Sequence, residues 1–121
     1  MTTSALSLRG VTKTFGSRTA VNGLDLSVRD GELLCLLGPN GAGKTTTIEM
    51  CEGFIAPTSG TISVLGLDPS SQPDQVRSRI GIMLQGGGSY NGLKAAEMLR
   101  LTARYYRNPH DPRLAARRAR T

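Results

Sequence analysis

The sequence contains little cysteine, no long hydrophobic run and no pattern of a secretory signal. Its two cysteines, Cys35 and Cys51, do not form a C-x-x-C pair, so neither a disulfide framework nor a cysteine-ligated zinc site is supported. The longest apolar run, residues 33–37, is far shorter than the roughly 20 residues of a membrane-spanning helix. The N-terminus lacks a basic segment followed by an apolar one. These absences favour a protein of the reducing cytosol.

Acidic residues are scarce only in one part of the chain. The 121 residues carry a net charge of +6, which raises the question of a phosphate-rich partner. Residues 1–93 hold seven basic and seven acidic residues, whereas residues 94–121 hold eight basic and two acidic ones. A charge run of this kind is more often a solvated extension than a binding tail. We therefore expect no nucleic-acid partner, and the 38% of hydrophobic residues allow one small packed domain.

The hydrophobic pattern alternates between strand-like and helix-like segments, which predicts an α/β fold. Strands are expected at residues 5–11, 18–28, 32–37, 61–65 and 80–84. Helices are expected at residues 44–52, 72–79 and 93–107, with Gly53 as a C-terminal cap of the first. The segment 32–37 is a continuous apolar run between glycines, which is typical of a strand buried on both faces of a parallel sheet.

The strongest motif is residues 38–45, GPNGAGKT, which match the phosphate-binding pattern G-x-x-x-x-G-K-[ST] at every fixed position. Glycines let the backbone turn its N–H groups toward a phosphate. Lys44 adds a positive charge for the β- and γ-phosphates, and Thr45 offers a hydroxyl to Mg²⁺. The helix that follows would present the positive end of its dipole to the anion.

Three further features agree with one family. They are Phe15-Gly16 upstream of the motif, the turn PTSGTI at residues 57–62, and Gln85 at the end of the expected strand IGIML. In this order and at these spacings they resemble the N-terminal half of the ATP-binding domain of ABC transporters. Residues 45–50 and 64–69 are most similar to exporters of the ABC-2 or drug-resistance kind.

The resemblance implies roles for individual residues, with ATP and Mg²⁺ as cofactors. Phe15 would stack on adenine and Val21 would lie beside the base. Thr46 would contact the α-phosphate, and Thr45 would bind Mg²⁺. Gln85 would contact Mg²⁺ or the attacking water as a catalytic residue, and it would sense the transmembrane partner. The implied nucleotide-binding residues are Phe15, Val21, Gly38, Pro39, Asn40, Gly41, Ala42, Gly43, Lys44, Thr45 and Thr46.

The same resemblance implies an organisation and a cellular setting. Residues 1–112 would form a partial ATP-binding domain with a P-loop NTPase core. Its parts would be an antiparallel β region at 4–30, the P-loop core at 31–85 and the start of a helical subdomain at 90–107, before a basic tail at 113–121. The partners would be a transmembrane permease subunit and a second ATP-binding subunit, at the cytoplasmic face of the cell membrane.

Three elements of the family's catalytic apparatus do not occur in the sequence. It has no LSGGQ signature and no apolar strand ending in Asp-Glu, and its one histidine, His110, lies in the turn sequence NPHDP. We therefore do not expect the chain to hydrolyse ATP alone. Three interpretations stay open: an N-terminal fragment of an exporter ATPase, a short non-hydrolysing nucleotide-binding or regulatory protein, and a small P-loop kinase. The kinase would use arginines of the tail as a lid, namely Arg113, Arg117, Arg118 and Arg120.

Overall fold

A computed structural model of the chain describes residues 4–39, 41–83, 92, 94–104 and 106. The chain forms two compact units, Met1–Arg77 and Ser78–Thr121. Asn40, Gln85, His110 and the four arginines of the tail, which carry predictions made above, lie outside the described residues.

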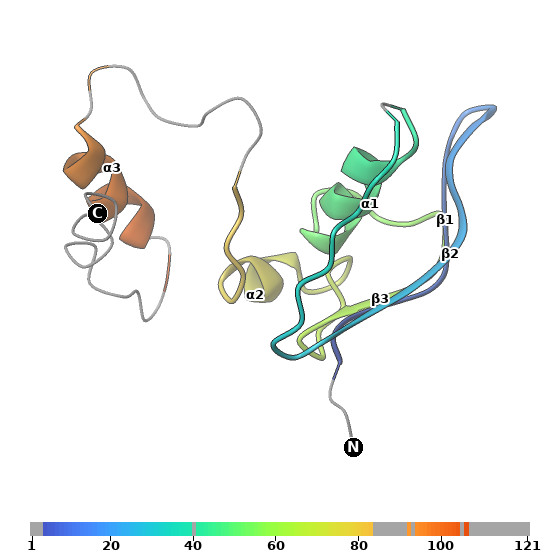
Figure 1. Cartoon of the computed structure of the whole chain (residues 1–121), viewed down its shortest axis with the longest axis horizontal. Helices are drawn as coiled ribbons and strands as arrows, with labels where there is room; N and C mark the ends of the chain where they lie inside the picture. The colour runs from blue at the N-terminus through green and yellow to red at the C-terminus, as the bar shows by residue number, and fades with distance from the viewer. Residues whose placement is uncertain (1–3, 40, 84–91, 93, 105, 107–121) are drawn as a thin grey trace. The chain divides into compact units, whose positions relative to one another are not determined.

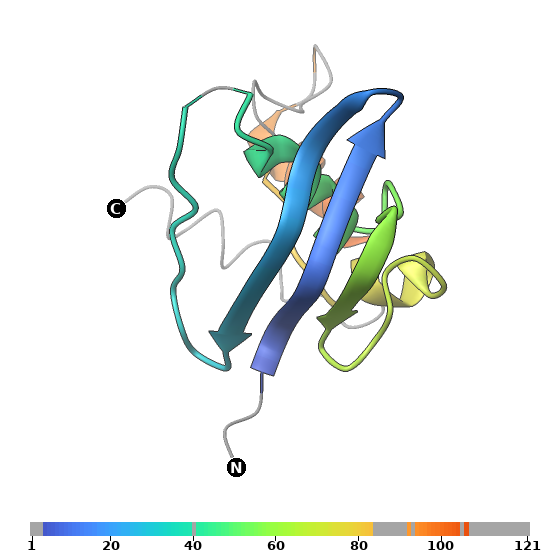
Figure 2. The same cartoon turned by 90° about the vertical axis from the view of Figure 1, so that its right-hand side faces the viewer.

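The first unit is built on a three-stranded antiparallel sheet (Figures 1 and 2). Strand β1 (Ser4–Phe15) and strand β2 (Arg18–Arg29) form a hairpin, and β3 (Ser59–Val64) pairs with the other edge of β1. Leu8 in the central strand lies opposite Leu26 of β2 and Ile62 of β3, so apolar residues meet across all three strands. The strands predicted at 5–11, 18–28 and 61–65 are confirmed, and β1 continues beyond its predicted end.

Helix α1 (Lys44–Cys51) packs on one face of this sheet and contacts β2 and β3 (Figure 2). Its Met50 is fully buried, as are Leu8 and Val11 of β1. Each such side chain contributes roughly 1.5–3 kcal/mol when it is removed from water. The short helix α2 (Pro73–Arg77) follows β3 and buries Val76. The core of the first unit is therefore centred on β1 and α1.

The end of α1 has the predicted glycine cap. Gly53 adopts a left-handed φ of 82°, which is a conformation that favours glycine. The N–H of Gly53 donates to the carbonyl of Met50 at 3.2 Å, and the N–H of Phe54 donates to the carbonyl of Glu49 at 3.0 Å. These bonds satisfy carbonyls that the last turn of a helix leaves without partners.

The prediction of a strand at residues 32–37 is wrong. This segment has no regular secondary structure, and its side chains at Leu33 and Leu37 are 90% and 88% exposed. Figure 2 shows it running apart from the sheet as a separate strip of chain. A buried parallel strand needs hydrogen-bonding neighbours, and the described residues supply none beside this segment. Residues 80–83 are likewise irregular, while Leu84, the end of that predicted strand, lies outside the described residues.

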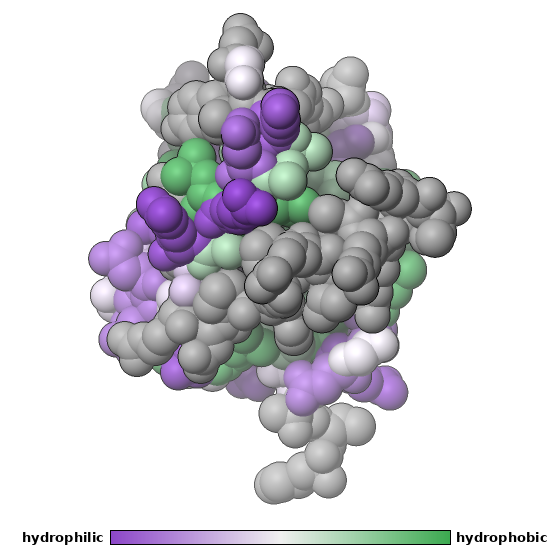
Figure 3. All heavy atoms as spheres, turned by 90° about the vertical axis from the view of Figure 1, so that its left-hand side faces the viewer, coloured by the Kyte–Doolittle hydropathy of each residue, from purple (hydrophilic) through white to green (hydrophobic). Residues whose placement is uncertain are grey.

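The second unit contains helix α3 (Ala95–Ala103), which lies within the helix predicted at 93–107. The backbone N–H of Lys94 donates to the carboxylate of Glu97 at 2.9 Å, which fixes the start of this helix. None of the residues of α3 is fully buried. On the side of the molecule in Figure 3, hydrophobic residues reach the surface beside hydrophilic ones. Across the described residues, every helix is too short or too polar to cross a membrane.

Candidate phosphate-binding site

The glycine loop before α1 leaves the start of that helix open. Gly41 and Gly43 have φ values of 84° and 89°, and the N–H of Ala42 donates to the carbonyl of Pro39 at 3.2 Å. Gly43 is the N-terminal boundary of α1, so no side-chain oxygen caps the helix, and its first turn contains no acidic residue. The N–H groups and the positive end of the helix dipole are therefore available to an anion.

Gly43 also fixes the loop against the sheet. A Cβ atom built on Gly43 would lie 2.3 Å from the carbonyl oxygen of Ala20 and 3.2 Å from Cγ2 of Val21. Both of these residues belong to β2. Because backbone atoms cannot move aside as a flexible side chain can, only glycine allows this close approach. Gly43 is thus needed both for the packing of the loop on β2 and for the bend of the loop.

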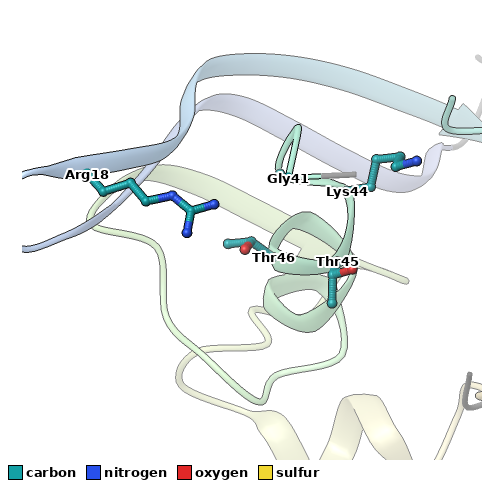
Figure 4. Close-up of a pocket in the computed structure, with 6 residues that line it drawn as sticks. Arg18, Gly41, Lys44, Thr45 and Thr46 are labelled. Atoms are coloured by element: carbon teal, nitrogen blue, oxygen red, sulfur yellow. The ribbon is translucent and has the colours of Figure 1, made fainter. Parts of the chain in front are cut away.

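Four motif residues and Thr46, which follows the motif, line one pocket at the start of α1 (Figure 4). The pocket has a volume of about 300 Å³, at the lower end of the range for small-molecule sites. Its lining residues are Gly41, Gly43, Lys44, Thr45, Thr46 and Arg18. Arg18 was not among the residues predicted from the sequence, because it comes from the start of β2 rather than from the motif. In the structure Arg18 lies beside the hairpin turn and pairs with Phe15, and no pattern of consecutive residues marks it in the sequence.

The lysine of the motif is already held by the loop. The ammonium group of Lys44 donates a hydrogen bond to the carbonyl oxygen of Gly38. This bond keeps the charge beside the loop, which is where an incoming phosphate would need it. Thr45 is exposed at the pocket. Thr47 has a different task, because its buried hydroxyl donates to the carbonyl of Gly43 at 2.8 Å within the helix.

The other described residues that were predicted to bind nucleotide do not line the pocket. Phe15 is 48% exposed at the end of β1, and the ammonium group of Lys13 lies 5.2 Å from the centre of its ring. Val21 is buried, and its Cγ2 is the atom that faces Gly43. Gly38, Pro39 and Ala42 belong to the exposed loop. Asn40 and Gln85 lie outside the described residues.

The pocket is positively charged. Of the described residues that line it, the two charged ones are Arg18 and Lys44. The pKa of Glu52, which follows α1, is raised first by burial and then by the charge of Glu49. This carboxyl group does not line the pocket. The described residues contain no group of three His, Cys, Asp or Glu side chains that could hold a metal. The positive charge of the lining is suited to an anion such as a phosphate.

Comparison with known proteins agrees with this geometry. Residues 21–120 match the family described as "ABC transporter". The chain belongs to the ABC transporter family. It is 42% identical to the daunorubicin/doxorubicin resistance ATP-binding protein DrrA of Streptomyces peucetius, over 84% of this chain and 31% of that protein. It is 39% identical to the Nod factor export ATP-binding protein I of Cupriavidus metallidurans, over 86% of this chain and 34% of that protein.

A much longer relative shares the same region. The glucosylceramide transporter ABCA12 of Mus musculus is 45% identical over 79% of this chain, which is 4% of that protein. The chain thus spans about a third of the two bacterial relatives and a small fraction of the mouse one. Both bacterial relatives are named for ATP binding.

Solved structures of the family share this fold. The ATP-binding subunit of an ABC transporter is 29% identical and superposes with a TM-score of 0.77, over 85% of this chain and 43% of that one. A nucleotide-free ATP-binding cassette is 32% identical, with a TM-score of 0.52 over 55% of this chain and 26% of that one. The predicted family and the predicted α/β fold of an ABC ATPase are confirmed.

Proposed function

We propose that residues 38–46 bind the phosphates of ATP together with Mg²⁺. The observation that carries the proposal is the pocket itself, which is lined by six residues at the open start of α1, two of them the cations Lys44 and Arg18. Lys44 would contact the β- and γ-phosphates, Thr45 the metal ion, and Thr46 the α-phosphate. The half-exposed ring of Phe15 would stack on adenine, with Val21 beside the base, and Gln85 would contact the metal or the attacking water.

In the whole protein, this site would drive export across a membrane. The names of the two bacterial relatives, one for Nod factor export and one for drug resistance, support an exporter. A transmembrane permease subunit would bind the ATP-binding subunit at the cytoplasmic face of the cell membrane. A second ATP-binding subunit would complete the site. Residues 1–112 would form the ATP-binding part of this chain, ahead of the basic tail.

The 121-residue chain by itself should bind ATP without turning it over. Hydrolysis needs a positioned water and a metal held from more than one side. The sequence contains no signature, no strand ending in Asp-Glu and no switch histidine. Steady-state phosphate release by the purified chain measures this directly, and sustained release that depends on Lys44 would contradict it.

Binding is tested by removing the motif cation. Lys44→Ala should weaken ATP binding more than about tenfold, because a hydrogen bond to a charged group contributes roughly 1.5–3 kcal/mol. Lys94→Ala is the matched control, since it removes the same charge from an exposed lysine of the other unit. Calorimetric titration with Mg-ATP gives both affinities. Equal affinities for the wild type and Lys44→Ala would refute the proposed phosphate site.

A further inference from the structure

The pocket contains a cation that the glycine motif does not supply. Arg18 is the first residue of β2, and it pairs with Phe15 across the turn of the β1–β2 hairpin. The contact between Gly43 and the carbonyl of Ala20 holds this end of β2 against the loop. Ala20 lies two residues after Arg18 in β2. The packing of β2 on the loop therefore also places Arg18 at the pocket.

The guanidinium group of Arg18 has no partner within the described part of the chain. No described residue forms an ion pair or a side-chain hydrogen bond with it. Lys44, in contrast, donates to the carbonyl of Gly38. A guanidinium keeps its charge at any physiological pH and presents a planar set of N–H donors that matches a phosphate. The guanidinium of Arg18 is therefore available to bind an anion in the pocket.

The direction of the Arg18 side chain indicates which phosphate of the nucleotide it would contact. Figure 4 shows the side chain of Arg18 reaching from β2 toward the start of α1, where the side chain of Thr46 points toward it. Lys44 points away, on the other side of the helix start. Arg18 therefore shares its side of the pocket with Thr46, and it comes from the same hairpin end as Phe15.

We propose that Arg18 binds the α-phosphate of the nucleotide, between the adenine and the glycine loop. This assignment rests on the proposed function, because it takes the pocket to be the nucleotide site. ATP and ADP both carry an α-phosphate, so Arg18 contributes to the affinity for each of them equally. It is a binding residue and does not distinguish the two nucleotides.

The experiment compares Arg18→Ala with Arg9→Ala in the 121-residue chain. Arg9 is an exposed arginine of the same sheet and lies outside the pocket, so both variants lose one positive charge. Calorimetric titrations at low salt use Mg-ATP and Mg-ADP. Arg18→Ala should weaken both by the same factor of about five to ten, which is the effect of one charge-assisted hydrogen bond discounted for exposure. Arg9→Ala should change both affinities less than twofold.

Further arms separate the possible failures. Arg18→Lys should recover part of the affinity, because a lysine keeps the charge but not the planar donors. Loss of affinity in Lys44→Ala with none in Arg18→Ala would overturn the role of Arg18 and leave the proposed function standing. An effect of Arg18→Ala on ATP alone would overturn the assignment to the α-phosphate. If the wild type binds neither nucleotide, the proposed function fails, and the role of Arg18 fails with it.

Discussion

The Phe15 ring illustrates how much a single side chain depends on its neighbours. The ammonium group of Lys13 lies 5.2 Å from the ring centre and also donates to the carbonyl of Ala56 at 2.8 Å. This contact orients the ring, and 48% of the residue stays open to solvent. An open aromatic face at the end of the hairpin is what a purine base requires for stacking.

Removing that ring should separate base binding from phosphate binding. Phe15→Ala should weaken ATP binding by about 1–3 kcal/mol, as base–aromatic stacking does elsewhere. Inorganic triphosphate carries no base, so its affinity should change little. Competition titrations with both ligands give the two values. Equal losses for ATP and triphosphate would show that Phe15 only supports the fold.

The two cysteines should differ sharply in reactivity. Cys35 is exposed, whereas burial, and to a lesser degree the charge of Glu52, raises the pKa of Cys51 to about 11. At pH 8 a disulfide-exchange reagent should modify one thiol per chain quickly and the second only after unfolding. Cys35→Ser should abolish the fast phase. Two thiols that react at the same rate would show that Cys51 is accessible.

The raised pKa of Cys51 makes the free energy of unfolding depend on pH. A thiol in the unfolded chain loses its proton near pH 9.0, whereas folded Cys51 keeps its proton until about pH 11. The contribution of Cys51 is therefore complete below pH 9 and is lost as the pH rises toward 11. Cys51→Ala should remove this part of the alkaline loss, and urea titrations at several pH values measure it.

At this scale, the local part of the site could be predicted and the tertiary part could not. Lys44, Thr45 and Thr46 follow from a motif of consecutive residues, because the bend and the helix start are local. Arg18 lines the same pocket only because β2 packs on Gly43. Nothing in the sequence around Arg18 encodes that contact, so a pattern of consecutive residues could not reveal it.

At the scale of elements, the junction between α1 and β2 decides whether the pocket exists. Gly43 and Gly41 have similar positive φ values, 89° and 84°. A Cβ on Gly43 would collide with the carbonyl of Ala20, whereas a Cβ on Gly41 would meet nothing within 4 Å. The two glycines thus separate the cost of the backbone conformation from the cost of the contact.

Alanine at each glycine should measure that difference. Gly41→Ala should lower the free energy of unfolding by about 1–2 kcal/mol, the cost of a left-handed conformation for a residue with a Cβ. Gly43→Ala should lower it by about 1–3 kcal/mol more, because the collision forces β2 and the loop apart. Urea denaturation gives both values. Equal losses in the two variants would mean that the loop does not press on β2.

The elements themselves were predictable where the chain supplies their hydrogen-bonding partners, either close in sequence or, for β3, in the distant strand β1. The β1–β2 hairpin and α1 satisfy their backbone groups within a short stretch of chain. Residues 32–37 have the composition of a buried strand, but a strand exists only in a pair. Composition reports what a segment can bury, and it does not report whether a neighbour is present.

At the scale of the whole molecule, residues 32–37 leave hydrophobic side chains exposed because no described strand pairs with them. Leu33 and Leu37 are almost fully exposed, and Met83 is 97% exposed. Exposed apolar side chains on an extended segment with free backbone groups favour association with another chain. The charge of +6 opposes this association only weakly, because salt screens it over about 10 Å.

The 121-residue chain should therefore self-associate through this segment. In sedimentation experiments the wild type should form oligomers as its concentration rises. The double variant Leu33→Lys, Leu37→Lys should form fewer of them, because it removes the apolar contact. The control Asn22→Lys, Thr61→Lys adds the same charge at exposed polar positions. If charge alone kept chains apart, the two variants would behave alike. A greater loss of oligomers in the leucine variant assigns the association to residues 32–37, and a monomeric wild type at high concentration would exclude it.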